Sequence, residues 1–203
     1  MTLYRLLRAL VGPALRLAWR LQVEGAENLP AYGPAIVVAN HDSLADPFVL
    51  GAALGRPLRF LSKQELWSNR LVGRMMDALG GIPVARARGA VGAVAAAARA
   101  LDAGDVVAIF PQGTTLGPPD RPWQRGAARL ASTTGAPLVP VALVGTREAL
   151  APGSRFPRLR ARVRVVVGKP IVVERSAPTI PATRELTARL RASVEDLASR
   201  ATR

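Results

Sequence analysis

The residues best suited to chemistry in this chain are its single histidine, His41, and the carboxylate of Asp46 five positions later. Histidine exchanges a proton near neutral pH, and a nearby carboxylate can hold its ring in one tautomer and stabilise its charged form. His41 follows the apolar run 36–39, which is typical of a buried strand, and Asp46-Pro47 suits the N-cap and first residue of a helix. We therefore expect the pair at a strand-to-helix turn, where open α/β sheets bind ligands. A structural alternative, in which Asp46 only caps the helix and His41 is an ordinary turn residue, stays open on these residues alone.

The residue inventory excludes several other chemistries. The chain has no cysteine, which removes disulfides, thiolate catalysis and cysteine-ligated zinc, and one histidine cannot form a multi-histidine metal site. No Gly-x-Ser-x-Gly turn occurs in the sequence, so the serine nucleophile of that motif is absent as well. We therefore favour direct action of His41 on a bound substrate over a covalent enzyme intermediate.

The pair must be positioned by an alternation of strands and helices along the chain. Strands are expected at 36–39, 58–61, 82–86, 105–110, 138–144 and 162–167, and helices at 48–54, 65–79, 90–103, 124–132 and from Pro181 onward. Pro140 interrupts one of these strands, which predicts an edge or bulge position for it. The alternation favours an α/β single-domain layered fold, with a central mixed β-sheet flanked by helices.

The N-terminal segment 1–24 is expected to form a basic amphipathic helix. Gly12-Pro13 could break this helix. Arginines recur among bulky apolar residues in this segment, and no stretch is long and uncharged enough to span a bilayer or to resemble a secretory signal. We expect this helix to lie in the membrane interface, with the remaining residues, 25–203, as the second unit. The alternative is a docking helix whose arginines face water.

The formal charge of +14 predicts an anionic partner, which could be lipid headgroups, nucleic acid or an acidic carrier. Nucleic-acid-binding modules interleave basic residues with exposed aromatic ones or carry a recognisable motif. Aromatic residues make up only 4% of the chain, and no RNP-like or zinc-finger pattern is present. We therefore expect a membrane lipid surface and no nucleic acid.

Four stretches resemble one known family. The stretch 40–47 (Asn-His-Asp-Ser-Leu-Ala-Asp-Pro) resembles the His-x-x-x-x-Asp motif of the 1-acylglycerol-3-phosphate acyltransferase family. That family's later blocks are similar, in the same order, to 81–86 (Gly-Ile-Pro-Val-Ala-Arg), 110–115 (Phe-Pro-Gln-Gly-Thr-Thr) and 138–142 (Leu-Val-Pro-Val-Ala). The resemblance implies transfer of a fatty acyl group from acyl-CoA or acyl-ACP to a lysophospholipid hydroxyl. The leading reaction would convert 1-acylglycerol-3-phosphate to phosphatidic acid at the cytoplasmic face of the cell membrane, with the acyl donor as co-substrate and no other cofactor or metal.

Within that resemblance, each motif residue has an expected role. His41 would be the general base and Asp46 would orient it. Backbone N–H groups of Gly113 and Thr114 are candidate donors to the tetrahedral oxyanion. Lys63 and Arg86 are the implied cations for a substrate phosphate, although each could equally be a solvated surface cation.

Two residues depart from the family pattern. The chain has Gln112 and Thr115 where the family block has Glu and Arg, and that arginine is the one the family uses for the acceptor's phosphate. Gln112 can still form hydrogen bonds with a substrate but has no charge. Arg86, Arg121 or Arg125 would supply the lost contact, or else the acceptor would be a lysolipid lacking a free phosphate. A catalytically inactive lipid-binding relative is the remaining alternative that these departures suggest.

Overall fold

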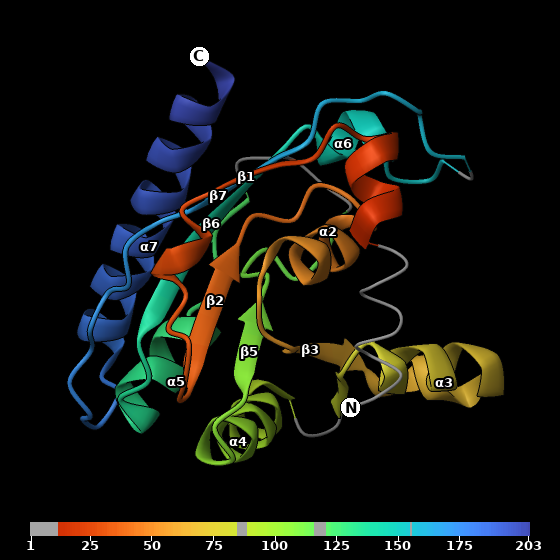
Figure 1. Ribbon diagram of the computed structural model, residues 1–203. Helices are drawn as coiled ribbons and strands as arrows, with labels where there is room; N and C mark the ends of the chain where they lie inside the picture. Colours follow the sequence, from red (N-terminus) through yellow and green to blue (C-terminus); the bar gives the residue numbers. More distant parts are fainter. Residues whose placement is uncertain (1–11, 85–88, 116–120, 155) are drawn as a thin grey trace.

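The computed structural model describes residues 12–84, 89–115, 121–154 and 156–203. Within these residues, seven strands form one sheet in the order β1-β7-β6-β2-β5-β3-β4 (Figure 1). The strands are β1 (Gln22–Glu24), β2 (Ala35–Ala39), β3 (Leu58–Lys63), β4 (Gly81–Val84), β5 (Val106–Ile109), β6 (Leu138–Val144) and β7 (Arg164–Val167). Neighbouring strands run parallel except β6 and β7, which are antiparallel. The predicted mixed sheet is thus confirmed.

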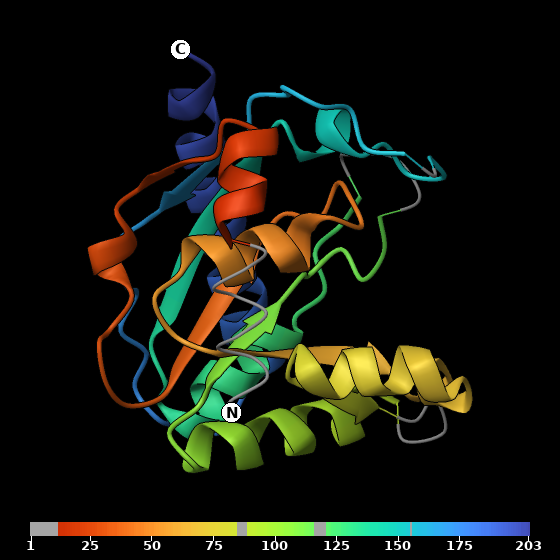
Figure 2. The ribbon, with the colours of Figure 1, turned by 45° about the vertical axis from the view of Figure 1, so that its right-hand side comes forward.

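Helices cover both faces of the sheet (Figures 1 and 2). They are α2 (Asp46–Ala53), α3 (Arg70–Ala78), α4 (Gly89–Asp102), α5 (Gly126–Thr134), α6 (Thr146–Ala149) and α7 (Ile180–Thr202), with the 3₁₀ turns η1 (Ala26–Asn28) and η2 (Gln64–Ser68). Residues 12–18 are also helical. This arrangement is the α/β layered fold that the alternating pattern predicts.

The central strand β2 shows why the sheet is covered on both sides. All five of its residues are buried, as expected for a parallel strand between two helical layers. Val37 packs in the core cluster that contains Val49 of α2, whereas Ile36 packs with Leu101 of α4 and Leu130 of α5. Because side chains alternate across a strand, one apolar run contributes to two hydrophobic cores.

The structure corrects the expected helix over 1–24. Residues 22–24 form β1, an edge strand that pairs in parallel with β7. The helix in this segment therefore ends before Gln22, and the division of the chain into 1–24 and 25–203 stays a prediction. Residues 1–11 lie outside the described part of the chain, and interfacial membrane contact by residues 12–18 stays a prediction. No helix in the described ranges is both long and apolar enough to cross a membrane.

The edge position expected for Pro140 is wrong, but the alternative, a bulge, agrees with the register. Val141 pairs with Val167 and Leu138 pairs with Ile171, so two residues of β6 face three residues of the neighbouring segment. Strand β6 lies in the interior of the sheet, between β7 and β2, and Pro140 is buried. The Pro140 carbonyl accepts a hydrogen bond from the Gly168 amide at 2.8 Å, so the residue faces the β7 side. Strand β7 ends at Val167. The missing proline N–H therefore falls in the irregular stretch between the pairs Val141–Val167 and Leu138–Ile171, while Pro140 keeps its register with Val38 of β2.

The helix expected over 65–79 is divided at Asn69. Residues 64–68 form the 3₁₀ turn η2, and the Asn69 side chain accepts hydrogen bonds from the amides of Leu71 and Val72 to start α3. The apolar residues have helical spacing over the whole range, but the N-cap Asn69 lies within it and starts a separate helix. The Trp67 indole N–H then donates to Asp77 at 2.8 Å and ties the turn to α3.

Candidate active site

His41 and Asp46 are in direct contact at the carboxyl end of β2. The His41 Nδ1 and Asp46 Oδ2 atoms are 2.8 Å apart. Asp46 is fully buried, whereas the His41 side chain keeps 15% of its surface exposed. The five-residue spacing therefore brings the imidazole and the carboxylate together across a strand-to-helix turn.

The surroundings of Asp46 determine the tautomer of His41. Asp46 Oδ2 also accepts hydrogen bonds from the backbone N–H groups of Asp42 and Ser43, each at 2.8 Å. A carboxylate with three such partners accepts only, so Nδ1 of His41 is the donor in their contact. Nε2 of the neutral ring is then the nitrogen with a free lone pair. This is the protonation state that a general base needs.

Asp46 is not the N-cap that the sequence suggested. It is the first residue of α2, the N-cap is Ala45, and no side chain caps this helix. The Asp46 carboxylate is directed back at the preceding turn instead, where it holds two backbone amides and the histidine. The helix cap expected for Asp46 is therefore wrong, whereas the catalytic roles of Asp46 and His41 stay predictions.

Asn40 holds the histidine turn against β6. Its side-chain amide donates to the Leu143 carbonyl at 2.8 Å, and its Oδ1 accepts from the Leu143 amide at 2.8 Å. The same amide nitrogen donates to Asp42 at 2.6 Å. Because these bonds extend the pairing of β2 with β6 past the end of the strand, the turn that follows has a defined position.

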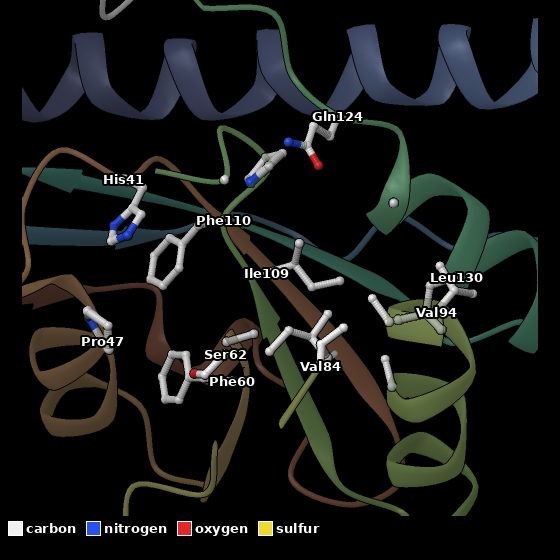
Figure 3. A pocket seen from close by; sticks show the side chains of 17 residues that line it. His41, Pro47, Phe60, Ser62, Val84, Val94, Ile109, Phe110, Gln124 and Leu130 are labelled. Atoms are coloured by element: carbon white, nitrogen blue, oxygen red, sulfur yellow. The ribbon is translucent and has the colours of Figure 1, made fainter. Parts of the chain in front are cut away.

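Phe110, from the carboxyl end of β5, packs against the His41 ring. The two ring centroids are 4.1 Å apart with an interplanar angle of 17°, and Phe60 of β3 continues the stack at 6.2 Å from Phe110. Strands β2 and β5 are parallel neighbours, so their carboxyl ends bring these residues to the same edge of the sheet. The aromatic contact fixes the ring plane of His41 (Figure 3).

A cavity of about 470 Å³ opens beside this stack. Strand β3 pairs with β5 only over Leu58–Phe60, and its continuation to Lys63 pairs with β4 instead. The cavity lies where β5 and β3 separate, between Ile109 and Phe110 on one side and Leu61 and Ser62 on the other. This separation gives His41 an apolar space inside the fold.

The cavity extends from the turn that holds His41 to the helical layer. His41 and Pro47 lie at one end, and Val94 and Leu130 at the other (Figure 3). The lining is mostly aliphatic and aromatic, and the polar side chains among the described lining residues are those of His41, Ser62 and Gln124. An elongated apolar ligand with one reactive polar end suits such a space.

The block after β5 differs from the sequence-based expectation. The Gly113 amide donates to the Phe110 carbonyl at 3.0 Å within the turn, so it is not available to an oxyanion. Gly113 has a φ of +72° and lines the cavity. Gln112 is 8% exposed and its Oε1 has no hydrogen-bond partner among the described residues. Neither Gln112 nor Thr114 is among the described residues that line the cavity.

The expected phosphate ligands can be placed only in part. Strand β3 ends at Lys63. Strand β4 ends at Val84, which pairs with Lys63, and Arg86 follows two residues later. Strands β3 and β4 run parallel to β5 and β2, so their carboxyl ends lie at the edge of the sheet that carries His41. Arg86 itself lies outside the described residues. Arg125 is exposed, and Thr115 and Arg121 are each partly buried.

Sequence reasoning missed three residues at this site. Asn40 directly precedes the histidine, but its role depends on Leu143, more than a hundred residues away. Phe110 was part of a recognised block, but its stacking on His41 follows from the order of the strands. Gln124 stood in a segment assigned to a helix, whereas it lies before α5 and lines the cavity. Only Asn40 offered a local signal, because its side chain ends an apolar run.

The sheet order and the flanking helices define an α/β fold. The contact of His41 with the buried Asp46 at a strand end is typical of an enzyme of this fold class. Comparison with solved structures supports this class: the crystal structure of the 1-acyl-sn-glycerophosphate acyltransferase PlsC from Thermotoga maritima has a TM-score of 0.74 at 25% sequence identity. The likeness covers 96% of this chain and 79% of that one. The Acyltransferase family matches residues 20–144, and the chain belongs to that family.

Curated relatives agree with this assignment. A chloroplastic 1-acyl-sn-glycerol-3-phosphate acyltransferase of Arabidopsis thaliana is 33% identical over 161 residues, covering 75% of this chain and 44% of the relative. The 1-acyl-sn-glycerol-3-phosphate acyltransferase of Bacillus subtilis is 28% identical over 158 residues, covering 77% of this chain and 76% of the relative. The chain thus spans less than half the length of the plant relative.

Proposed function

We propose that this chain moves a fatty acyl group from the thioester of acyl-CoA or acyl carrier protein to the hydroxyl of a lysophospholipid. The acceptor placed first is 1-acylglycerol-3-phosphate, because the plant and Bacillus relatives carry it in their names. The observation that carries the proposal is the 2.8 Å contact of His41 with the buried Asp46, beside an apolar cavity of about 470 Å³.

In the proposed reaction, Nε2 of His41 takes the proton of the acceptor hydroxyl as that oxygen attacks the thioester carbonyl. Asp46 stays ionised and stabilises the imidazolium through Nδ1–H. Collapse of the tetrahedral intermediate breaks the C–S bond and leaves the ester. The departing thiolate then takes this proton from Nε2, so the histidine returns to its neutral starting state.

The oxyanion needs a donor other than the Gly113 amide, which is occupied within its turn. The side-chain amide of Gln124 and the hydroxyl of Ser62 are the donors that we propose, since both line the same cavity as His41. Gln124 lies over Gly113: a Cβ built at Gly113 would be 2.8 Å from Gln124 Nε2. A residue with a side chain at position 113 would displace this amide.

We assign the cavity to the acyl chain of the donor. Its walls are apolar at the end distant from His41, where Val94 and Leu130 lie (Figure 3). Burial of each methylene there would contribute about 0.8 kcal/mol. The thioester carbonyl would then rest at the mouth, beside the base.

Lys63 and Arg86 remain the proposed ligands of the acceptor's phosphate. Arg121 or Arg125 would make the phosphate contact that the family's arginine makes at the position of Thr115. Thr115 and Gln112 are both uncharged, and this favours a second candidate, a lysolipid without a free phosphate. We further propose a peripheral position at the cytoplasmic face of the membrane, where a water-borne donor and a membrane-borne acceptor meet.

The test is acyl transfer by purified protein with labelled acyl-CoA or acyl carrier protein and a panel of lysolipids. His41→Ala is expected to abolish turnover, and Asp46→Asn to lower kcat by about 10²- to 10⁴-fold, because the ring loses its orientation and its counter-charge. Circular dichroism would verify that both variants fold. Unchanged turnover in both folded variants, on every acceptor, would refute the proposed roles.

A further inference from the structure

Ser43 is a fully buried polar residue between His41 and Asp46, and the proposed reaction assigns it no role. Its backbone and its side chain make three hydrogen bonds. The backbone N–H donates to Asp46 Oδ2 at 2.8 Å. The hydroxyl donates to the Leu150 carbonyl at 2.6 Å and accepts from the Ala45 amide at 3.1 Å. The hydroxyl therefore acts both as donor and as acceptor, and its position is defined from two sides.

The hydrogen bonds to Asp46 are concentrated on one of its two oxygens. Oδ2 accepts from the amides of Asp42 and Ser43 and from Nδ1 of His41. The other oxygen, Oδ1, is buried and has no hydrogen-bond partner among the described residues. The donors on Oδ2 therefore set the direction of the carboxylate. A shift of the Ser43 amide would move the group on which the tautomer of His41 depends.

Two anchors outside the turn hold it, one before His41 and one after it. Asn40 makes two hydrogen bonds with Leu143, and the Ser43 hydroxyl makes one with Leu150. Leu143 lies shortly before α6 in the chain, and Leu150 follows α6 directly. The residues on either side of one short helix thus hold both ends of the segment 40–43.

The Leu150 carbonyl is itself held in place. The Leu150 amide donates to the Thr146 carbonyl at 2.9 Å and closes the turn of α6, and the Arg158 amide donates to the Ala149 carbonyl at 2.8 Å. Ala149 is fully buried in the hydrophobic core. The hydroxyl of Ser43 therefore connects the turn to an acceptor that the surrounding structure fixes.

We propose that Ser43 is a positioning residue for His41 and acts through the Asp46 carboxylate. Its hydroxyl fixes the Ser43 backbone between Leu150 and the start of α2, and its amide then holds Asp46 Oδ2 where this oxygen accepts from the ring. Ser43 is not among the described residues that line the cavity, so we assign it no contact with substrate. The inference rests on the proposed function, since it concerns the base of the same reaction.

The single histidine of the chain allows a direct test, because its ring signals need no assignment. Nitrogen NMR of isotope-labelled histidine compares the full-length parent chain with Ser43→Ala and Asp46→Ala, at a pH where the ring is neutral. The parent chain is expected to show mainly the Nδ1–H tautomer. In Ser43→Ala the Nε2–H fraction is expected to rise at least about twofold, towards its value in Asp46→Ala, because the carboxylate is no longer fixed on Nδ1.

Steady-state kinetics give the second measurement. Ser43→Ala is expected to lower kcat by about tenfold and to keep KM within about twofold, since a displaced base slows the reaction without loss of a substrate contact. The matched control is Thr187→Ala, which removes a buried hydroxyl that donates to the Thr183 carbonyl at 2.7 Å on α7. Thr187 does not line the cavity, so this control is expected to keep the kcat and the tautomer of the parent chain.

Circular dichroism and urea denaturation verify that each variant is folded. Ser43→Ala is expected to lose some stability, because the Leu150 carbonyl and the Ala45 amide lose a partner. Ser43→Cys keeps nearly the same volume and a weak donor, and it takes the place of Ser43→Ala if that variant does not fold. The tautomer fraction and kcat are then expected to change in the same direction by a smaller factor.

Three outcomes would overturn the inference. The first is a parent chain whose ring is mainly in the Nε2–H form. The second is a folded Ser43 variant with the tautomer fraction and the kcat of the parent chain. The third is an equal change in the Ser43 and Thr187 variants, which is what a general loss of stability produces.

The inference and the proposed function can fail separately. If the parent chain transfers no acyl group to any acceptor while the tautomer still shifts in Ser43→Ala, the proposed function fails and the positioning of His41 by Ser43 stands. If acyl transfer requires His41 but neither kcat nor the tautomer depends on Ser43, the inference fails and the proposed function stands.

Discussion

Substitution of Val94 by phenylalanine tests the assignment of the cavity to an acyl chain. Val94 lies on α4 at the end of the cavity distant from His41 (Figure 3). A phenylalanine adds about four carbon atoms to that space, which a bound acyl chain then loses. At about 0.8 kcal/mol for each buried methylene, the loss is about 3 kcal/mol, or about 200-fold in kcat/KM.

We expect kcat/KM to decrease only for donors with a long acyl chain. We expect the ratio of kcat/KM for stearoyl-CoA to that for octanoyl-CoA to drop by about 200-fold in Val94→Phe, because a short chain ends before it reaches the ring. The assay is steady-state transfer over a series of saturated acyl-CoAs. Valine and phenylalanine have similar helix propensities, and the new ring fills an existing space, so the variant should fold.

Val91→Phe is the matched control, since Val91 lies on the same helix and is 70% exposed. Its chain-length profile should equal that of the parent chain. If Val94→Phe is folded and its profile is also unchanged, the acyl chain binds elsewhere and the cavity assignment is wrong.

Two further substitutions test how the histidine is held. Phe110→Leu keeps an apolar side chain but removes the 4.1 Å stack on His41, so we expect a decrease in kcat of about 2- to 10-fold with little change in KM; an unaltered kcat would show that the stack does not position the ring. Asn40→Ala leaves the buried amide and carbonyl of Leu143 unpaired, and we expect a loss of about 2–4 kcal/mol in the free energy of unfolding. Urea denaturation measures that loss, Asn40→Asp should recover part of it by accepting from the Leu143 amide, and an unchanged midpoint in Asn40→Ala would contradict the anchoring role.

Local patterns in the sequence were sufficient to predict the main helices and strands and the contact of His41 with Asp46. The apolar run before His41 and the Asp46-Pro47 helix start lie within one turn of chain, so their spacing alone brings the imidazole and the carboxylate within reach. Local patterns were less complete where a local preference has two structural outcomes. Pro140 was expected at an edge or a bulge because it lacks an N–H; it lies inside the sheet, opposite a one-residue bulge in the segment after β7.

Local patterns along the chain predicted the alternation of strands and helices, the mixed layered fold, and the contact of His41 with Asp46. These follow from side-chain periodicity, capping chemistry and short loops, which act over a few residues. Long-range packing sets the strand order, the separation of β5 from β3 that opens the cavity, and the contacts of His41 with Phe110 and of Asn40 with Leu143. Such contacts depend on which distant segments pack together, and that choice is made by the energy of the whole core rather than by any one stretch of chain.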